Sequence, residues 1–170
     1  MTLFEKLIKT NGPPAVILIR LLVGAIFLSE GVQKFLFTAE VGVGRFAKIG
    51  IPSPEIMAPF VGVVEAACGS LLLLGLFTRL ATIPLIITML VAILSTKIPI
   101  LVGHGFWGFN LRTVPYYGFW GMAHEIRTDW SLLLGSIFLF IVGAGKWSLD
   151  AYFASKSGGK DACEPTQKSI

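Results

Sequence analysis

Residues 56–77 read IMAPFVGVVEAACGSLLLLGLF, an apolar run that contains one charged side chain, Glu65. The run is close to the roughly 20 residues that a helix needs to cross a hydrocarbon core of about 30 Å. A carboxylate inside such a segment costs roughly 2.5–3.5 kcal/mol on insertion scales, and ionisable residues at this depth usually have a function. The run therefore predicts a membrane-spanning helix that keeps a polar group inside the bilayer.

The composition of the whole chain extends this interpretation. Of its 170 residues, 54% are hydrophobic and only 14% are charged, whereas soluble domains carry about 25% charged residues. The apolar residues form four blocks, at about 15–36, 56–77, 80–101 and 131–147. We therefore predict an all-α, integral membrane four-transmembrane-helix bundle. It would form a single membrane domain over residues 1–150, followed by a polar cytoplasmic tail over residues 151–170.

Two further segments flank the predicted spans. Residues 3–8 place their apolar side chains on one helical face, which predicts a short N-terminal interfacial helix. The connection from Val102 to Trp130 is rich in Trp, Tyr and Gly, and connections of this length are usually functional or disordered. Because this one is too aromatic for disorder, we predict an extracytoplasmic lid that folds back onto the mouth of the bundle.

The basic residues indicate topology. Four spans place both termini on the same side of the membrane, and Lys and Arg are slightly more numerous on that side. This bias favours cytoplasmic termini and external long connections. The net charge of +4 is explained by topology and by attraction to anionic lipid. No basic run with interleaved aromatics occurs, so we do not expect a nucleic-acid partner.

Ionisable side chains of the first two spans lie at similar depths. At about 1.5 Å per residue, Glu30 lies roughly 22 Å above the inner end of span one, and Glu65 lies roughly 18 Å above the inner face. Lys34 follows Glu30 by one turn, in the favourable i, i+4 order. We predict a polar pocket in the outer half of the bundle, where these side chains bind a polar head group or move protons. The alternative is an interhelical hydrogen-bonded network with a purely structural role.

Further candidates for ligand binding lie around this pocket. Trp120, His124 and Glu125 belong to the aromatic segment that would cover it. Arg20 lies in the inner third of span one and forms either a separate site or an anchor, whereas Arg79 can extend to the lipid head groups. The spacing of the histidines and Glu125 matches no recognised ligand pattern, so we expect no metal site.

Other kinds of chemistry lack a motif. Cys68 and Cys163 form no C-x-x-C pair, so the chain encodes neither a disulfide framework nor a dithiol redox centre. No P-loop and no G-x-S-x-G motif occurs, and Gly103-x-Gly105-x-x-Gly108 follows no strand. Nucleotide binding and serine hydrolase chemistry therefore have no support.

Several short motifs occur in a fixed order along the chain. They are Arg20, Gly31-x-x-Lys34, Gly50-Ile51-Pro52, Glu65-x-x-x-Gly69, Leu74-Gly75-x-x-Thr78-Arg79, a Glu in the last connection, and Trp147-Ser148-Leu149-Asp150. Each motif is weak alone, but the combination is fairly specific. From about Ile17 to Asp150 it resembles the DoxX family of small bacterial four-helix membrane proteins.

The resemblance implies a multi-pass DoxX-like bundle in the bacterial inner membrane, within a quinone-linked or thiol- or sulfur-related oxidoreductase system. Some members of the family are related to thiosulfate:quinone oxidoreductase subunits. Redox work by such a subunit would need a quinone as cofactor or a membrane or periplasmic redox partner, and a homo-oligomer is a further option. Arg20, Lys34, Glu65 and Arg79 match the pattern directly, and Glu125 would be the loop acid. Since no paired cysteine motif is present, we do not expect direct thiol–disulfide exchange by this chain alone.

The leading hypothesis is therefore a membrane subunit of an oxidoreductase system with an intramembrane polar site. Its catalytic candidates are Glu65, Glu30, Lys34 and Arg20. One alternative is a non-enzymatic module that binds or transports a small molecule or lipid, and another is an assembly subunit of a membrane complex. The chain contains no self-contained catalytic motif, so the sequence leaves open whether it is an enzyme.

Overall fold

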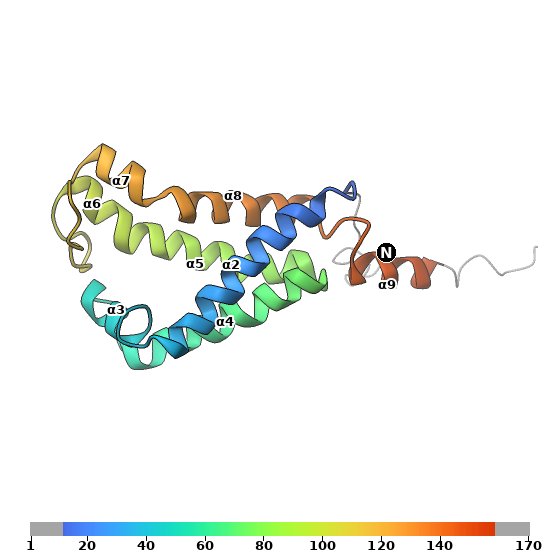
Figure 1. Cartoon of the computed structure of the whole chain (residues 1–170), viewed down its shortest axis with the longest axis horizontal. Coiled ribbons are helices and arrows are strands. Elements are labelled where there is room, and N and C mark those ends of the chain that lie inside the picture. The colour runs from blue at the N-terminus through green and yellow to red at the C-terminus, as the bar shows by residue number, and fades with distance from the viewer. Residues whose placement is uncertain (1–11, 159–170) are drawn as a thin grey trace, which may run out of the picture.

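The computed structural model describes residues 12–158, and this part of the chain is helical, with no β-strand (Figure 1). The predicted interfacial helix at residues 3–8 lies outside the described residues, as does most of the predicted tail. The helical elements are α2 (Val16–Leu36), α3 (Val43–Ile49), α4 (Pro54–Leu74), α5 (Thr78–Ala92), η1 (Ile93–Lys97), α6 (Ile98–Val102), α7 (Phe119–Glu125), α8 (Arg127–Val142) and α9 (Leu149–Gly158).

Three helices in the described part are long and apolar enough to cross a membrane. They are α2, α4 and the continuous helix over Thr78–Val102 that comprises α5, η1 and α6. These three correspond to the first three predicted spans. Helix α8 has 16 residues, or about 24 Å, which is short for a hydrocarbon core of about 30 Å. The fourth crossing stays a prediction.

Several helix boundaries differ from the sequence prediction, and glycines explain two of them. Helix α4 ends at Leu74 rather than Phe77 because Gly75 takes the left-handed conformation, with φ 67°. Helix α8 ends at Val142 rather than Trp147 because Gly143 has φ 85° and ψ −165°, a conformation that only glycine adopts readily. In addition, α8 begins at Arg127, which extends it into the predicted aromatic segment.

Helices α2 and α4 pack with their backbones almost in contact. A Cβ atom on Gly31 would lie 2.5 Å from the Ala66 backbone nitrogen, and one on Gly69 would lie 2.6 Å from the Leu28 nitrogen. Any larger side chain at these two positions would force the helices apart. Gly31 and Gly69 therefore form the close-packing surface between the two helices.

The remaining helices close the bundle around an apolar core. Helix α5 packs against both α4 and α8, and Val23, Phe27, Leu72, Leu85 and Leu139 are fully buried between these elements. Many large apolar side chains on the opposite faces of α2, α4, α5 and α8 are exposed. A surface of this kind is compatible with lipid and not with water, which agrees with a membrane location.

The two ends of the bundle differ in construction. At one end, α3, α6 and α7 lie together with the long connection, and at the other end α8 leads into α9 (Figure 1). The long connection is attached to the first end through the backbone. The Asn110 N–H donates to the Ile49 carbonyl at 2.7 Å, and the Gly118 N–H donates to the Ile100 carbonyl at 3.0 Å. We call this the α3–α6 end.

Candidate functional site

The structure brings Lys34 of α2 and Glu65 of α4 together as an ion pair. Their side chains are only 9% and 3% exposed, respectively. The close packing of Gly31 against α4, one turn before Lys34, explains how two separate helices place these groups in contact. A buried carboxylate and a buried ammonium satisfy each other, which offsets part of the cost of removing both from water.

A second ion pair joins η1 to α8 and was missed by the sequence analysis. The Lys97 ammonium lies 3.0 Å from the Asp129 carboxylate, and the two side chains are 5% and 21% exposed. Lys97 lies near the end of the third predicted span, and Asp129 lies in the aromatic segment. Like Glu65, Lys97 is an ionisable residue within an apolar segment. Such a residue usually has a function, so the sequence does contain an indication of a second site.

The backbone conformation around Lys97 explains why its side chain points into the bundle. Residues 93–97 form a π-helical turn, in which the Ile98 N–H donates to the Ile93 carbonyl. Pro99 follows and has no N–H to donate, while the Thr96 hydroxyl donates to the Ala92 carbonyl at 2.6 Å. Such a turn changes the direction of the side chains that follow it, and turns of this type are frequent at functional sites.

Both ion pairs line one cavity of about 410 Å³. Its walls come from α2, α3, α4, α5, η1, α8 and the end of α7, and most of the lining side chains are apolar. Glu30, Arg45 and Glu125 also line it. Ligand pockets in proteins have volumes of about 300–1,000 Å³ and combine apolar walls with a few placed polar groups. The cavity has both properties, and we call it the central cavity.

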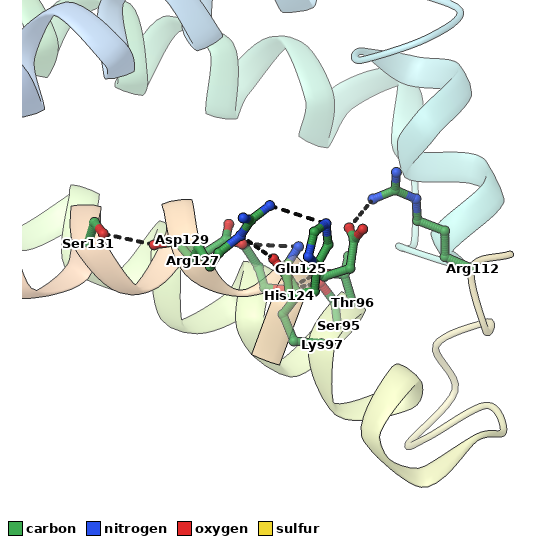
Figure 2. A network of polar contacts seen from close by, with 10 residues as sticks. Ser95, Thr96, Lys97, Arg112, His124, Glu125, Arg127, Asp129 and Ser131 are labelled. Atoms are coloured by element: carbon green, nitrogen blue, oxygen red, sulfur yellow. Dashed lines mark hydrogen bonds and ion pairs between the residues drawn. The ribbon is translucent and has the colours of Figure 1, made fainter. Parts of the chain in front are cut away.

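Glu30, Lys34, Glu65 and Glu125 are the predicted site residues that line the central cavity. The Glu125 carboxylate also accepts a hydrogen bond from Arg112 at 3.3 Å (Figure 2). Lys97 joins Asp129 in the same network of polar contacts.

Trp120 and His124 do not line the cavity, and both side chains are exposed. Arg127 donates to the His124 carbonyl at 2.7 Å and lies 3.2 Å from its ring nitrogen (Figure 2). The cover that the aromatic segment was expected to provide is therefore limited to its final residues, from Glu125 onward. Within residues 12–158 no three metal-ligating side chains of the His, Cys, Asp or Glu type lie together.

Arg20 and Arg79 lie at the opposite end of the bundle. Arg20 is buried, and its guanidinium donates to the carbonyls of Ala144 and Trp147, each at 2.7 Å. Arg79 donates to the Ile141 carbonyl at 3.0 Å. Arg20 precedes Lys34 by 14 positions, or about 21 Å along α2, and neither arginine lines the central cavity. Both instead fix the end of α8 and the turn that follows it.

Asp150 adds further contacts at the α9 end of the bundle, and we call Arg20, Arg79 and Asp150 together the clamp. Its carboxylate accepts hydrogen bonds from the backbone N–H groups of Phe77 at 2.8 Å and Thr78 at 3.1 Å, where α5 begins. A negative charge at a helix N-terminus is favourable. Burial raises the pKa of Asp150 above its ordinary value, while these hydrogen bonds and the charge of Arg20 act in the opposite direction. The motifs around Arg20, Gly75 and Asp150 are thus explained by local structure.

A second cavity of about 430 Å³ lies at the α3–α6 end and shares Arg45 and Ile49 with the central cavity. Lys48 and Arg112 also line it. Its walls are joined by Asn110, whose side-chain amide donates to the Lys48 carbonyl at 3.1 Å. Glu40 lines it as well, so the lining residues beside this end of the central cavity carry a formal net charge of +2.

Comparisons with known proteins agree with the architecture. Residues 15–98 match the model of the DoxX family. The chain is 51% identical to an uncharacterized membrane protein of Mycobacterium tuberculosis, over 91% of this chain and 90% of that protein. It is 29% identical to a Bacillus subtilis protein provisionally named as an oxidoreductase, CatD, over 84% of this chain and 90% of that protein. No solved structure matches the chain.

Proposed function

This chain belongs to the DoxX family of membrane proteins, and on that premise we propose that it is a membrane subunit of a quinone-linked oxidoreductase system. Its central cavity would bind the polar head of the quinone. The observation that carries the proposal is that two ion pairs, Lys34–Glu65 and Lys97–Asp129, line the same largely apolar cavity. The name of the Bacillus subtilis relative supports the redox part of the proposal.

The chemistry of the two ion pairs suits both forms of a quinone. A quinone ring has two carbonyl oxygens at opposite positions, and the reduced form has two hydroxyls in their place. Each lysine can donate a hydrogen bond to a carbonyl oxygen, and each carboxylate can accept one from a hydroxyl. When bound, the quinone supplies the capacity to carry two electrons and two protons. The protein's own groups bind and orient the ring.

The charge of the cavity also favours an uncharged head group. Four carboxylates and three cationic side chains line it, which gives a formal net charge of −1. These residues are Glu30, Glu65, Glu125 and Asp129, and Lys34, Arg45 and Lys97. A site of near-zero net charge attracts free anions weakly, whereas its donors and acceptors still bind a neutral polar ring. Low local dielectric strengthens each of these hydrogen bonds.

The same geometry supports a second candidate function, which is non-enzymatic binding or transport of an amphipathic molecule. The observation in its favour is that most of the lining side chains are apolar, among them Phe27, Met89 and Leu132. Such walls can bind the apolar part of a ligand, and this binding does not require electron transfer. Under this alternative the ion pairs orient a polar head group and take no part in redox chemistry.

The proposal is tested with the purified protein in lipid nanodiscs and menadione, a tail-free naphthoquinone, as the probe. We expect menadione to raise the melting temperature and Glu65→Gln to weaken its binding roughly tenfold, or about 1.4 kcal/mol. Glu55→Gln is the matched control because Glu55 is exposed on the same helix and does not line the cavity. No binding by the wild type, or equal effects of the two variants, would contradict the proposal.

A second measurement distinguishes the two candidate functions. Membranes that contain the wild type or Glu65→Gln are compared for the rate of quinone reduction by their resident dehydrogenases. A lower rate with Glu65→Gln supports the oxidoreductase subunit. Equal rates, together with weakened menadione binding, support the non-enzymatic module.

A further inference from the structure

The large apolar side chains that line the central cavity and are also exposed lie on one side of it only. Of the side chains that line it, the exposed large apolar ones are Met57 and Phe60 on α4, and Ile87 and Val91 on α5. Their exposed fractions are 38%, 60%, 56% and 47%, respectively. Each of these four residues therefore faces both the cavity and the outside of the bundle.

The wall on the other side is closed by buried groups. Phe27 of α2 and Leu132 of α8 line the cavity with exposed fractions of 0% and 4%. Helices α4 and α5 instead diverge from each other between the turn that connects them and the α3–α6 end (Figure 1). The exposed apolar residues that line the cavity thus lie on the two helices that diverge, and we call this region the α4–α5 gap.

The α4–α5 gap lies at the depth of the hydrocarbon core. Phe60 is six residues from the start of α4, or about 9 Å along the helix axis. Ile87 is nine residues from the start of α5, at the opposite end of the bundle, or about 14 Å along its axis. Both positions fall within spans of 21 and 25 residues that are apolar enough to cross a membrane. A molecule that reaches the cavity through this gap is dissolved in lipid.

We propose that the α4–α5 gap is a lateral opening to the bilayer, and that the ligand is an amphipath whose apolar tail occupies this gap. Its polar head would lie in the central cavity against the two ion pairs. The volume of about 410 Å³ holds a ring-sized head group, and the opening lets a long tail remain in the membrane. This inference rests on the proposed function and specifies the ligand as a long-tailed lipid rather than a water-soluble small molecule.

The test uses two probes with the same head group, menadione and phylloquinone, which adds a phytyl tail. Val91→Trp narrows the gap. Leu90→Trp is the matched control because Leu90 is the neighbouring residue, is 46% exposed and does not line the cavity. Ligand-dependent thermal stabilisation is measured for each variant in nanodiscs of identical lipid. Because both variants add the same side chain to the lipid-facing surface, differences in partitioning of the probes cancel.

We expect Val91→Trp to raise the half-saturating concentration of phylloquinone roughly tenfold, which corresponds to about 1.4 kcal/mol, and that of menadione less than twofold. Leu90→Trp should change neither. If Val91→Trp weakens both probes equally, or acts no differently from Leu90→Trp, the gap does not hold the tail. Binding of menadione without phylloquinone also overturns the lateral opening and leaves the cavity as the site. If neither quinone stabilises the wild type, the proposed function fails together with this inference.

Discussion

The Lys97 ammonium lies 3.0 Å from the Asp129 carboxylate and joins the π-helical turn η1 to α8. The Lys97 side chain is 5% exposed, so Asp129 is the group that compensates its charge in the described structure. Removing one partner of a buried ion pair leaves an uncompensated charge, whereas removing both leaves none. This asymmetry makes the contact testable.

We predict that Asp129→Leu destabilises the protein by about 3 kcal/mol, the lower end for broken buried pairs, because Asp129 is 21% exposed. The double variant Lys97→Met/Asp129→Leu should recover most of that loss. Unfolding in mixed micelles is the measurement, with Lys146→Met as a control for removal of an exposed lysine. A double variant less stable than Asp129→Leu would show that Lys97 is not held by this contact.

For Lys34 and Glu65, a double variant distinguishes the contribution of the ion pair to stability from its contribution to ligand binding. We expect the double variant Lys34→Met/Glu65→Leu to fold with nearly wild-type stability because an apolar pair of similar volume replaces a buried ion pair. Menadione binding should nevertheless be lost, since the donor and the acceptor are both gone. Stability and binding are read from the same melting curves with and without the quinone. Wild-type affinity in this variant would assign the pair a purely structural role.

We predict that substitutions in the clamp at the α9 end lower the stability of the protein and leave menadione binding unchanged. Asp150→Ala removes the acceptor for the Phe77 and Thr78 N–H groups at the start of α5, which should cost about 1–2 kcal/mol, as for other lost helix caps. Arg20→Lys should also destabilise, because a lysine cannot reproduce the two-pronged contact with Ala144 and Trp147.

Arg79→Lys is the comparison for the clamp, since among the described residues Arg79 makes one exposed hydrogen bond, with the Ile141 carbonyl. We expect its effect to be smaller than that of Arg20→Lys. Menadione affinity should be unchanged in all three clamp variants. A selective loss of affinity in Arg20→Lys would return Arg20 to the binding site.

The contact between α2 and α4 is sensitive to single methyl groups. Gly31→Ala places a Cβ atom 2.5 Å from the Ala66 nitrogen, and since a backbone atom cannot move aside, we expect a loss of about 1–3 kcal/mol, typical of overpacking. Ala25→Val adds volume on an exposed face of the same helix and should be close to neutral. The two variants are compared by unfolding in mixed micelles. Equal stability would show that the helices are less closely packed.

The number of crossings is testable through the termini. If α8 crosses the membrane, both termini lie on the same side, and the long connection around Arg112 lies on the other. Reporter tags at the N-terminus, after Arg112 and at the C-terminus should therefore report cytoplasm, exterior and cytoplasm. Termini on opposite sides would show that the 16-residue α8 does not span.

Several features of the site could be predicted from the sequence because they depend on regular helices. The constant rise of a helix places Glu30 and Glu65 at similar depth, and the glycines at steps of three and four indicate which faces meet. These two facts predict a shared pocket, whereas the direct contact between Lys34 and Glu65 is seen only in the structure. By contrast, Lys97 could not be placed in this way, because the π-helical turn before it breaks the period on which such reasoning relies.

The resemblance of the motifs identified the family but not the role of each motif. Arg20 and Asp150 match the pattern as well as Glu65 does, yet they bind backbone groups and do not line the central cavity. A list of motif residues does not distinguish a clamp from a ligand site. Only the positions of the carbonyls of Ala144 and Trp147 show that both terminal nitrogens of Arg20 are hydrogen-bonded there.

The sequence by itself determined the membrane location, three of the predicted spans and the presence of ionisable groups within them, because hydropathy and helix length are local properties of the chain. The tertiary structure alone decided that Glu65 shares a cavity with Lys97 and Asp129, and that exposed apolar side chains of α4 and α5 line this cavity. These features depend on how helices distant in sequence cross and separate. That geometry is set by glycine contacts and a single π-helical turn, which hydropathy does not record.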